Sequence, residues 1–219
     1  MVRIARIVLA GGPHLLCQRG NRGGRLFFSS GDRQRYLEIV GACFRSCGVK
    51  LWAYRITGSE VLMVAVPAAP EALGEALRNA HGRYSQFVNR RQNTAGHLFQ
   101  GRFYSCPLDG DFLALAVRHV ERFGGALPPV TASSAGHHCD RRRSGGPLAD
   151  DLPLLKTVRD WRRWLARPIE RAELAYLLGR LRVGKPAGSP QFVRRVERLT
   201  GQNLSRPRGR PRKHKPAAR

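Results

Sequence analysis

Acidic residues are scarce in this chain of 219 residues. There are 15 of them against 39 lysines and arginines, which leaves a formal net charge of +24. Only five of the basic residues are lysines. GC-rich coding would explain that preference for arginine, but it does not explain the shortage of acids. A field of this sign attracts polyanions, and nucleic acid is the leading candidate.

Long apolar runs and paired cysteines are also missing. No segment approaches the roughly 18 apolar residues of a membrane span, and the apolar stretch after Met1 is too short for a secretory signal. The five cysteines are odd in number and lack Cys-x-x-Cys spacing, a pattern typical of reduced thiols rather than of disulfides or a zinc site. We therefore expect a cytoplasmic protein without a membrane partner, with Cys43 and Cys47 on one helix face in the core.

The periodicity of apolar residues predicts seven elements in the first part of the chain. The expected strands are 14–19, 49–56, 60–66 and 102–108. The expected helices run from a cap at Asp32 to Gly48, from Pro70 to Arg91, and from a cap at Asp111 to Phe123. The order β-α-β-β-α-β-α predicts an α+β fold with a ferredoxin-like β-α-β-β-α-β core, in which helices cover one face of an antiparallel sheet.

A stretch rich in Gly, Pro and Ser follows at 124–150 and predicts a linker between this core (1–123) and a helical extension (151–204). It holds His137 and His138 beside Cys139 and Asp140. Those four residues leave a metal site open as an alternative to a solvated loop.

The extension is expected to be mostly helical. Its docking residues are predicted to be Trp161, Trp164 and Leu165. Its last helix has Ser189 as the cap, Pro190 at the first position and Gly201 as the stop. The predicted inner face of that helix is Phe192, Val193, Val196 and Leu199.

The final segment, 205–219, contains no acidic residue and is expected to be a disordered basic tail. The tail contains a Gly-Arg-Pro sequence like that of an AT-hook, and its predicted DNA-binding residues are Arg208, Arg210, Arg212 and Lys213. Such a sequence can lie extended in a narrow A·T minor groove, where the negative potential is strongest. A nonspecific phosphate-binding tail is the alternative.

Several segments fall together in the order and spacing of a known family. They are HLLCQRGNR (14–22), LWAYRITGSEVLMVAVP (51–67), RYSQFVNRR (83–91), GHLFQGRFYSCPLD (96–109), VRHVER (117–122) and GKPAGSPQFVRRVERLTGQNLSRPRGRPRK (184–213). Together they resemble the REP-associated tyrosine transposases, which are relatives of the IS200-type single-strand transposases. The resemblance covers nearly the whole chain except 124–150.

The resemblance implies a chemistry that this sequence has altered. Such proteins cut single-stranded DNA near a hairpin with a tyrosine nucleophile, and two histidines on a strand hold a divalent cation. The two histidine positions fall on Glu60 and Leu62, the tyrosine on His119, and an amide one turn later on Phe123. Because all four are substituted, we expect no cofactor and no cleavage, with Mg²⁺ or Mn²⁺ relevant only if activity remains.

Some routes to residual chemistry stay open. Glu60 can ligate Mg²⁺ or Mn²⁺, whereas Leu62 offers no ligand atom. His119 is either a substitute nucleophile or a partly buried histidine on a helix face. Tyr84 and Tyr104 are the other nearby candidates: Tyr84 is expected in the core, and Tyr104 is expected to face DNA.

The predicted DNA-binding residues gather in three loops, although each alone would also suit a solvated surface. They are Arg19, Asn21, Arg22, Asn89, Arg90, Arg91, His97, Gln100 and Arg102. Phe99 and Phe103 lie between them and are expected either to stack on bases or to close the core.

We therefore expect a transposase-like protein that binds single-stranded or hairpin DNA. One alternative is an active metal-dependent strand transferase with a relocated nucleophile. Others are a general RNA- or polyanion-binding protein and a decaying product that folds poorly. The sequence leaves monomer and homodimer both open.

Overall fold

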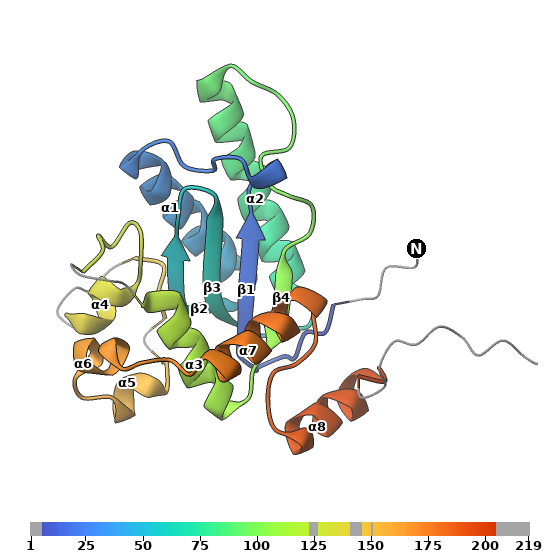
Figure 1. Ribbon diagram of the computed structural model, residues 1–219. Helices are drawn as coiled ribbons and strands as arrows, with labels where there is room; N and C mark the ends of the chain where they lie inside the picture. The colour runs from blue at the N-terminus through green and yellow to red at the C-terminus, as the bar shows by residue number, and fades with distance from the viewer. Residues whose placement is uncertain (1–5, 123–126, 141–145, 150, 205–219) are drawn as a thin grey trace, which may run out of the picture.

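A four-stranded antiparallel sheet forms the centre of the protein (Figure 1). The computed structural model describes residues 6–122, 127–140, 146–149 and 151–204. The strands are β1 (His14–Arg19), β2 (Val49–Ile56), β3 (Glu60–Pro67) and β4 (Tyr104–Pro107), in the order β2-β3-β1-β4. This is the ferredoxin-like order and it confirms the predicted α+β class, although the fourth strand is shorter than the predicted 102–108.

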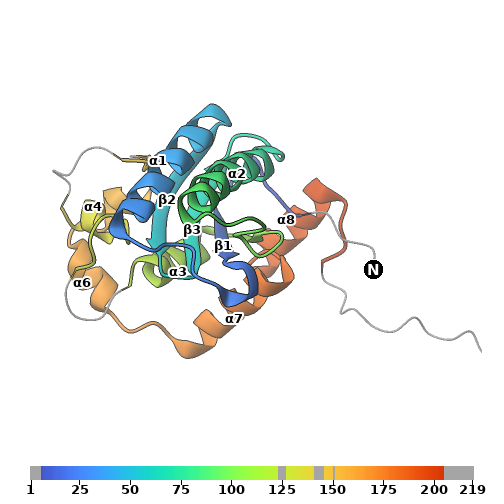
Figure 2. The same ribbon diagram turned by 90° about the horizontal axis from the view of Figure 1, so that it is seen from above.

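Two long helices, α1 (Ser30–Ser46) and α2 (Ala72–Gln92), cover one face of the sheet (Figure 2). Successive strand residues point to opposite faces, so Leu16 and Met63 pack on this side. They join an aromatic cluster in which Tyr36 lies edge-on to Tyr84, with ring centroids 5.0 Å apart. Tyr84 is fully buried, as predicted, and its hydroxyl donates a hydrogen bond to the carbonyl of Leu26.

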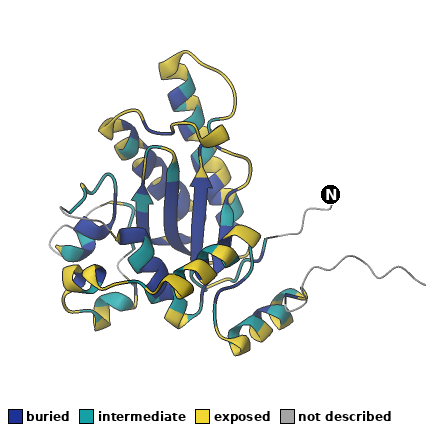
Figure 3. Cartoon of the chain, viewed as in Figure 1, coloured by how far each residue is buried: buried dark blue, intermediate teal, exposed yellow. Residues whose placement is uncertain are grey.

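The opposite face is also covered, which differs from the prediction of helices on one face. Helices α3 (Gly110–Glu121) and α7 (Arg171–Val183) pack there, with Val117 and Leu177 against Leu15 and Val64 of the sheet. Burial follows this arrangement: the strands are buried on both sides, and exposed residues lie on the outer faces of the helices (Figure 3). The apolar alternation of the strands does not reveal such a second layer.

Three predicted helix starts were displaced by two or three residues. The first helix is capped by Ser29, and Asp32 completes a capping box from the third helical position. The second begins at Ala72 rather than at Pro70, and the third is capped by Asp109, whose side chain accepts the Phe112 N–H. The third helix ends at Glu121, so the predicted Phe123 lies outside both this helix and the described residues.

The segment predicted as a linker packs against the edge of β2 in both of its described parts, 127–140 and 146–149. The Ile56 N–H donates to the Ala132 carbonyl at 2.7 Å, and the Ser134 N–H donates to the Tyr54 carbonyl at 3.0 Å. A short helix, α4 (Ala135–Cys139), follows, and α5 (Leu154–Thr157) and α6 (Trp161–Ala166) continue this layer. The segment is therefore not a solvated loop, because backbone pairing ties it to the sheet.

A buried carboxylate joins α3 to that layer. Glu121 is fully buried and accepts hydrogen bonds from Ser134 Oγ, from His138 Nδ1 at 2.6 Å and from Trp161 Nε1 at 2.7 Å. His138 is therefore neither solvated nor part of a metal cluster among the described residues. The predicted docking of Trp161 and Leu165 is confirmed, since each is 3% exposed.

The last helix, α8 (Pro190–Thr200), has the predicted ends: Ser189 caps it and Gly201 terminates it in the left-handed conformation. Its contact is small, with Val196 buried against Ile7 and Leu204. Leu199 was predicted to face inward but is 67% exposed. The apolar face of this helix is longer than the surface that packs against it, so Leu199 stays exposed.

Cys43 is buried as predicted, but Cys47 caps the end of α1 and is only half-buried. Within the described ranges, no helix has the length and apolar character needed to cross a membrane. The predicted basic tail, 205–219, lies outside those ranges together with Arg208, Arg210, Arg212 and Lys213. The proposed division into core, linker, extension and tail stays a prediction.

Candidate nucleic-acid interface

Two of the three predicted DNA-binding loops pair with each other through their backbones. The Asn21 N–H donates to the Leu98 carbonyl at 2.9 Å, and the Gln100 N–H donates to the Arg19 carbonyl at 2.8 Å. Gly20 permits the tight turn that follows, because a Cβ at that position would lie 2.0 Å from the Gly24 carbonyl oxygen. A short 3₁₀ turn, η1 (Asn21–Gly23), follows.

This pairing gathers exposed polar side chains at one end of β1. The exposed residues of the two paired loops that were predicted from the sequence are Arg19, Asn21, Arg22, His97, Gln100 and Arg102. They stand on a rigid base, since Gln18 of β1 also donates from Nε2 to the Gln100 carbonyl at 3.1 Å. The sequence did not indicate that the two loops would meet.

A groove of about 800 Å³ runs beside these loops and along α2. Phe99 and Phe103 form part of its wall, but each is only 8% exposed, so both close the core rather than offer free faces for stacking. Arg6 lies over the ring of Phe103 at 3.7 Å. Burial, followed by the charge of Arg102, lowers the pKa of Arg6 to about 10, which still leaves it charged at neutral pH.

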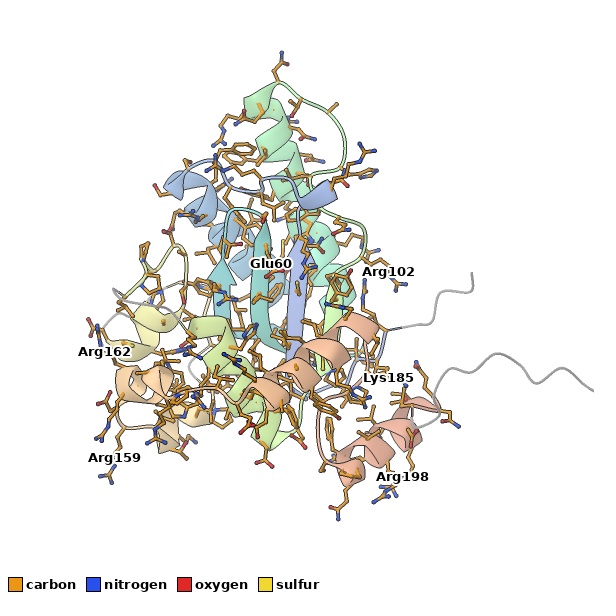
Figure 4. The ribbon with its side chains drawn as sticks, viewed as in Figure 1. Glu60, Arg102, Arg159, Arg162, Lys185 and Arg198 are labelled. Atoms are coloured by element: carbon orange, nitrogen blue, oxygen red, sulfur yellow. The ribbon has the colours of Figure 1, made fainter. Side chains whose placement is uncertain are left out.

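The groove is basic without being uniformly so. Its charged lining residues are Arg6, Arg78, Arg102, Glu71 and Glu75. The two acids lie at the start of α2, and Arg102 extends from the loop end of the groove at the margin of the molecule (Figure 4). The loop end therefore suits an anion better than the helix end does.

The third predicted group, at the end of α2, divides into two roles. Arg91 forms an ion pair with Asp32 through its two terminal nitrogens, Nη1 and Nη2, with Nη2 2.8 Å from Oδ2. Asp32 is fully buried, so Arg91 compensates a charge inside the protein. Asn89 donates to the Gly96 carbonyl at 3.0 Å and holds the loop that follows.

Arg90 is exposed, and it lines a second, shallower groove between α1 and α2. This groove has a volume of about 510 Å³ and is lined by Arg35, Arg83, Gln86, Phe87, Arg90 and Arg91. Arg35 and Arg91 are paired with acids, at Glu38 and Asp32. Arg83 and Arg90 form no ion pair with an acid within the part of the chain that the structure describes.

Three of the four positions to which the sequence resemblance assigned chemistry come together beneath α3. Glu60 and Leu62 lie on the face of β3 that α3 covers, and Glu60 stands at the start of this central strand (Figure 4). His119 is half-buried in the last turn of α3 and is close enough to Glu60 and Arg55 for both charges to act on it. The fourth position, Phe123, lies outside the described residues.

The groups in this cluster have shifted proton affinities. Burial, followed by the charge of Arg55, lowers the pKa of His119 to about 4, although Glu60 opposes the shift. Its imidazole is therefore neutral at neutral pH. Burial and the neighbouring Glu60 raise the pKa of Cys17 to about 12, so its thiol is not a ready nucleophile.

These residues do not fit a divalent cation. Leu62 offers no ligand atom, and Oε2 of Glu60 already accepts from Arg19 Nε at 2.8 Å and from Cys17 Sγ at 3.5 Å. Across the described ranges, no three His, Cys, Asp or Glu side chains are grouped so as to hold a metal. A cationic guanidinium, that of Arg55, stands beside them instead.

Arg55 is the residue of this cluster that the sequence prediction missed. Strand register pairs it with Leu62, Leu62 with Cys17, and Cys17 with Tyr104, so the four form one row across the sheet. A charged residue in the otherwise apolar end of VKLWAYRI was the available signal, because buried strands rarely carry an unpaired arginine. Tyr104 is half-buried at the far end of the row.

Comparison with known proteins identifies a solved structure that has the same fold. No protein-family model matches the chain, and no curated protein matches it. Among solved structures, a REP-associated tyrosine transposase bound to a REP hairpin matches with a TM-score of 0.51 and 13% identity. The match covers 69% of this chain and 93% of that one. At this identity the likeness establishes a shared fold.

Proposed function

We propose that this chain is a transposase-like DNA-binding protein that recognises single-stranded or hairpin DNA. The observation that carries the proposal is the backbone pairing of the 19–24 and 97–102 loops, which brings Arg19, Arg22 and Arg102 to one end of the sheet. Basic groups that track a phosphate backbone are the main requirement of such binding. The structural neighbour, which has the same fold, was solved with a REP hairpin.

The proposal includes the loss of strand cleavage. A Leu at position 62 supplies no metal ligand, and Glu60 is engaged by Arg19 and Cys17. Position 119 carries an imidazole in place of the phenol of the family's nucleophile. A DNA-binding protein without the family's metal-dependent cleavage accounts for both changes.

An active strand transferase with a relocated nucleophile is the alternative, and Tyr104 is the candidate that favours it. Tyr104 is half-buried in the same row as Leu62 and Cys17, with Arg19 6.0 Å from its ring centroid. This alternative requires covalent protein–DNA adducts, whereas the main proposal excludes them.

Fluorescence anisotropy with four nucleic acids of equal length tests the binding proposal. They are a DNA hairpin with a single-stranded 5′ extension, unstructured single-stranded DNA, blunt duplex DNA and an RNA hairpin. We expect the DNA hairpin to bind most tightly, with an affinity that falls steeply with salt. Equal affinity for all four would show general polyanion binding and contradict the proposal.

Two matched variants locate the surface in the same assay. Arg102→Gln is expected to weaken hairpin binding about tenfold, because it removes one phosphate contact at the loop end of the large groove. Arg159→Gln removes the same charge from a distant margin of the molecule (Figure 4) and is expected to change affinity less than twofold. Equal losses in both variants would argue against these loops as the binding surface.

A further inference from the structure

The guanidinium of Arg55 is incompletely satisfied within the fold. Its Nε is buried and has no hydrogen-bond partner among the described residues. Burying such a donor without a partner is unfavourable, so an unmet donor of this kind at a polar cluster points to a missing acceptor. Arg55 is half-buried and stands on the sheet face that α3 covers.

The nearest acid does not neutralise Arg55. The Glu60 carboxylate acts on it at a distance, but the ion pair that Glu60 makes is with Arg19, at 2.8 Å. Arg55 forms no ion pair within the part of the chain that the structure describes. The cluster therefore carries two guanidinium groups against one carboxylate.

Solvent reaches this cluster from the end of the sheet. Arg19 is exposed, with 55% of its side chain accessible, and Glu60 keeps 26%. Tyr104 and His119 are half-buried. Arg19 is therefore the more accessible of the two guanidinium groups to an approaching anion, and Arg55 the less accessible.

We propose that Arg55 binds one backbone phosphate of the bound DNA through its planar guanidinium, at the place where the family holds a divalent cation. This inference rests on the proposed function. A guanidinium can present two parallel N–H groups to two phosphate oxygens, a geometry that a metal-free site needs to hold a phosphodiester in one orientation.

The consequence is DNA binding that needs no divalent cation. The positive charge that a metal would supply is built into β2, so chelation leaves affinity unchanged. No covalent step is involved, because the site is a phosphate receptor rather than a catalytic centre. The positions that hold a metal in the family lack metal ligands here. The proposal explains this, because the same place would bind a phosphate directly.

A methylphosphonate scan of the hairpin tests this, with binding measured in EDTA. Each phosphate is replaced in turn by a neutral methylphosphonate, and wild type is compared with Arg55→Gln. We expect one replacement to weaken wild-type binding about tenfold and to have no further effect on Arg55→Gln, which itself binds about tenfold more weakly. The same variant is expected to reduce the salt slope by about one.

Two further variants separate this contact from general effects. Arg45→Gln removes an exposed arginine just before β2, at the opposite end of the strand from Arg55, and is expected to retain wild-type affinity. Arg55→Lys keeps the charge but loses the bidentate fork, so its affinity is expected to fall several-fold at that same phosphate. It also replaces Arg55→Gln in the scan if thermal unfolding shows that the glutamine variant does not fold.

Each remaining outcome overturns the inference in an identifiable way. Wild-type affinity in Arg55→Gln or in Arg55→Lys, or a methylphosphonate effect that persists in both, rules out the Arg55 contact while hairpin binding stands. Loss of wild-type binding on addition of EDTA means that a metal holds the phosphate. A wild-type protein that does not prefer the hairpin removes the proposed function and this inference together.

Discussion

At the scale of single residues, two adjacent arginines with the same expected role have different ones. Arg91 pairs with the fully buried Asp32, while Arg90 is exposed in the groove between α1 and α2. Burial works to raise the pKa of Asp32, but hydrogen bonds from Arg91, Phe28 and Ser29 together lower it below its ordinary value. The carboxylate is therefore ionised and depends on these partners.

The two arginines can be separated by substitution. We expect Arg91→Ala to lower the free energy of unfolding by roughly 2–4 kcal/mol, because it leaves a buried carboxylate without its counter-ion. We expect Arg90→Ala to leave stability unchanged and to weaken hairpin binding several-fold. Urea unfolding and anisotropy measure the two effects. Reversed effects, with Arg90→Ala unstable and Arg91→Ala stable, would contradict this assignment.

A second prediction at this scale concerns acid stability. His14 is fully buried, its Nε2 accepts the Leu9 N–H at 3.1 Å, and its Nδ1 donates to the Gly12 carbonyl at 2.8 Å. Burial is the larger influence on it, outweighing the Gly12 hydrogen bond, and lowers the pKa of His14 to about 4. The unfolded chain takes up this proton near pH 6.5, whereas the folded chain resists it until about pH 4.

Stability from this group is therefore complete above about pH 6.5 and is lost as the pH falls toward 4. For His14 alone, the free energy of unfolding is expected to drop by about 2 kcal/mol between pH 7 and pH 5. His14→Gln is expected to be less stable at pH 7 but to show a flatter pH dependence. Urea unfolding at the two pH values checks this, and an equally steep dependence in the variant would contradict it.

At the scale of elements, the sequence identified the four strands and the first three helices but not how the later segments dock. Strand ends follow from alternation, which is local. The predicted helix start was wrong where two nearby residues could each act as the N-cap, as with Asp109 and Asp111. The conformation of the preceding turn decides which of them caps the helix. The ends of α8 were predicted correctly, because each end had a single candidate signal: Ser189 with Pro190 at the start and Gly201 at the end.

The packing of 127–140 could not be predicted from composition. Its Gly and Ser residues resemble a linker, but Ser134 pairs with Tyr54 and with Glu121, both distant in sequence. Arg55 was missed for a similar reason, since its neighbours His119 and Glu60 meet it only in the folded sheet. Local patterns predict elements, whereas these sites depend on contacts between them.

Glu121 holds this layer in place, so its substitution is the prediction at the element scale. Ser134, His138 and Trp161 all donate to its carboxylate. Glu121→Gln puts an amide group against three donors, and we expect it to lower the free energy of unfolding by roughly 3 kcal/mol or more. Glu38→Gln, an exposed carboxylate on α1, is the control. Comparable stability of both variants by urea unfolding would argue against the network.

At the scale of the whole molecule, the proposed DNA binding rests on the net charge and on the paired loops. The net charge of +24 gives long-range attraction to nucleic acid, and the paired loops give a defined place for it. In the proposed function, the cluster beneath α3 is the feature that separates binding from cleavage. Its donor set suits a phosphate rather than a divalent cation, and this contrast is the centre of the proposed function.

The most direct test is to incubate the protein with labelled hairpin DNA and Mg²⁺ or Mn²⁺, then to run a native gel beside a denaturing one. We expect a shifted band on the native gel, the same shift in EDTA, and no protein-linked DNA on the denaturing gel. A metal-dependent covalent band, mapped to Tyr104 or His119, would contradict the account and identify the chain as an active strand transferase.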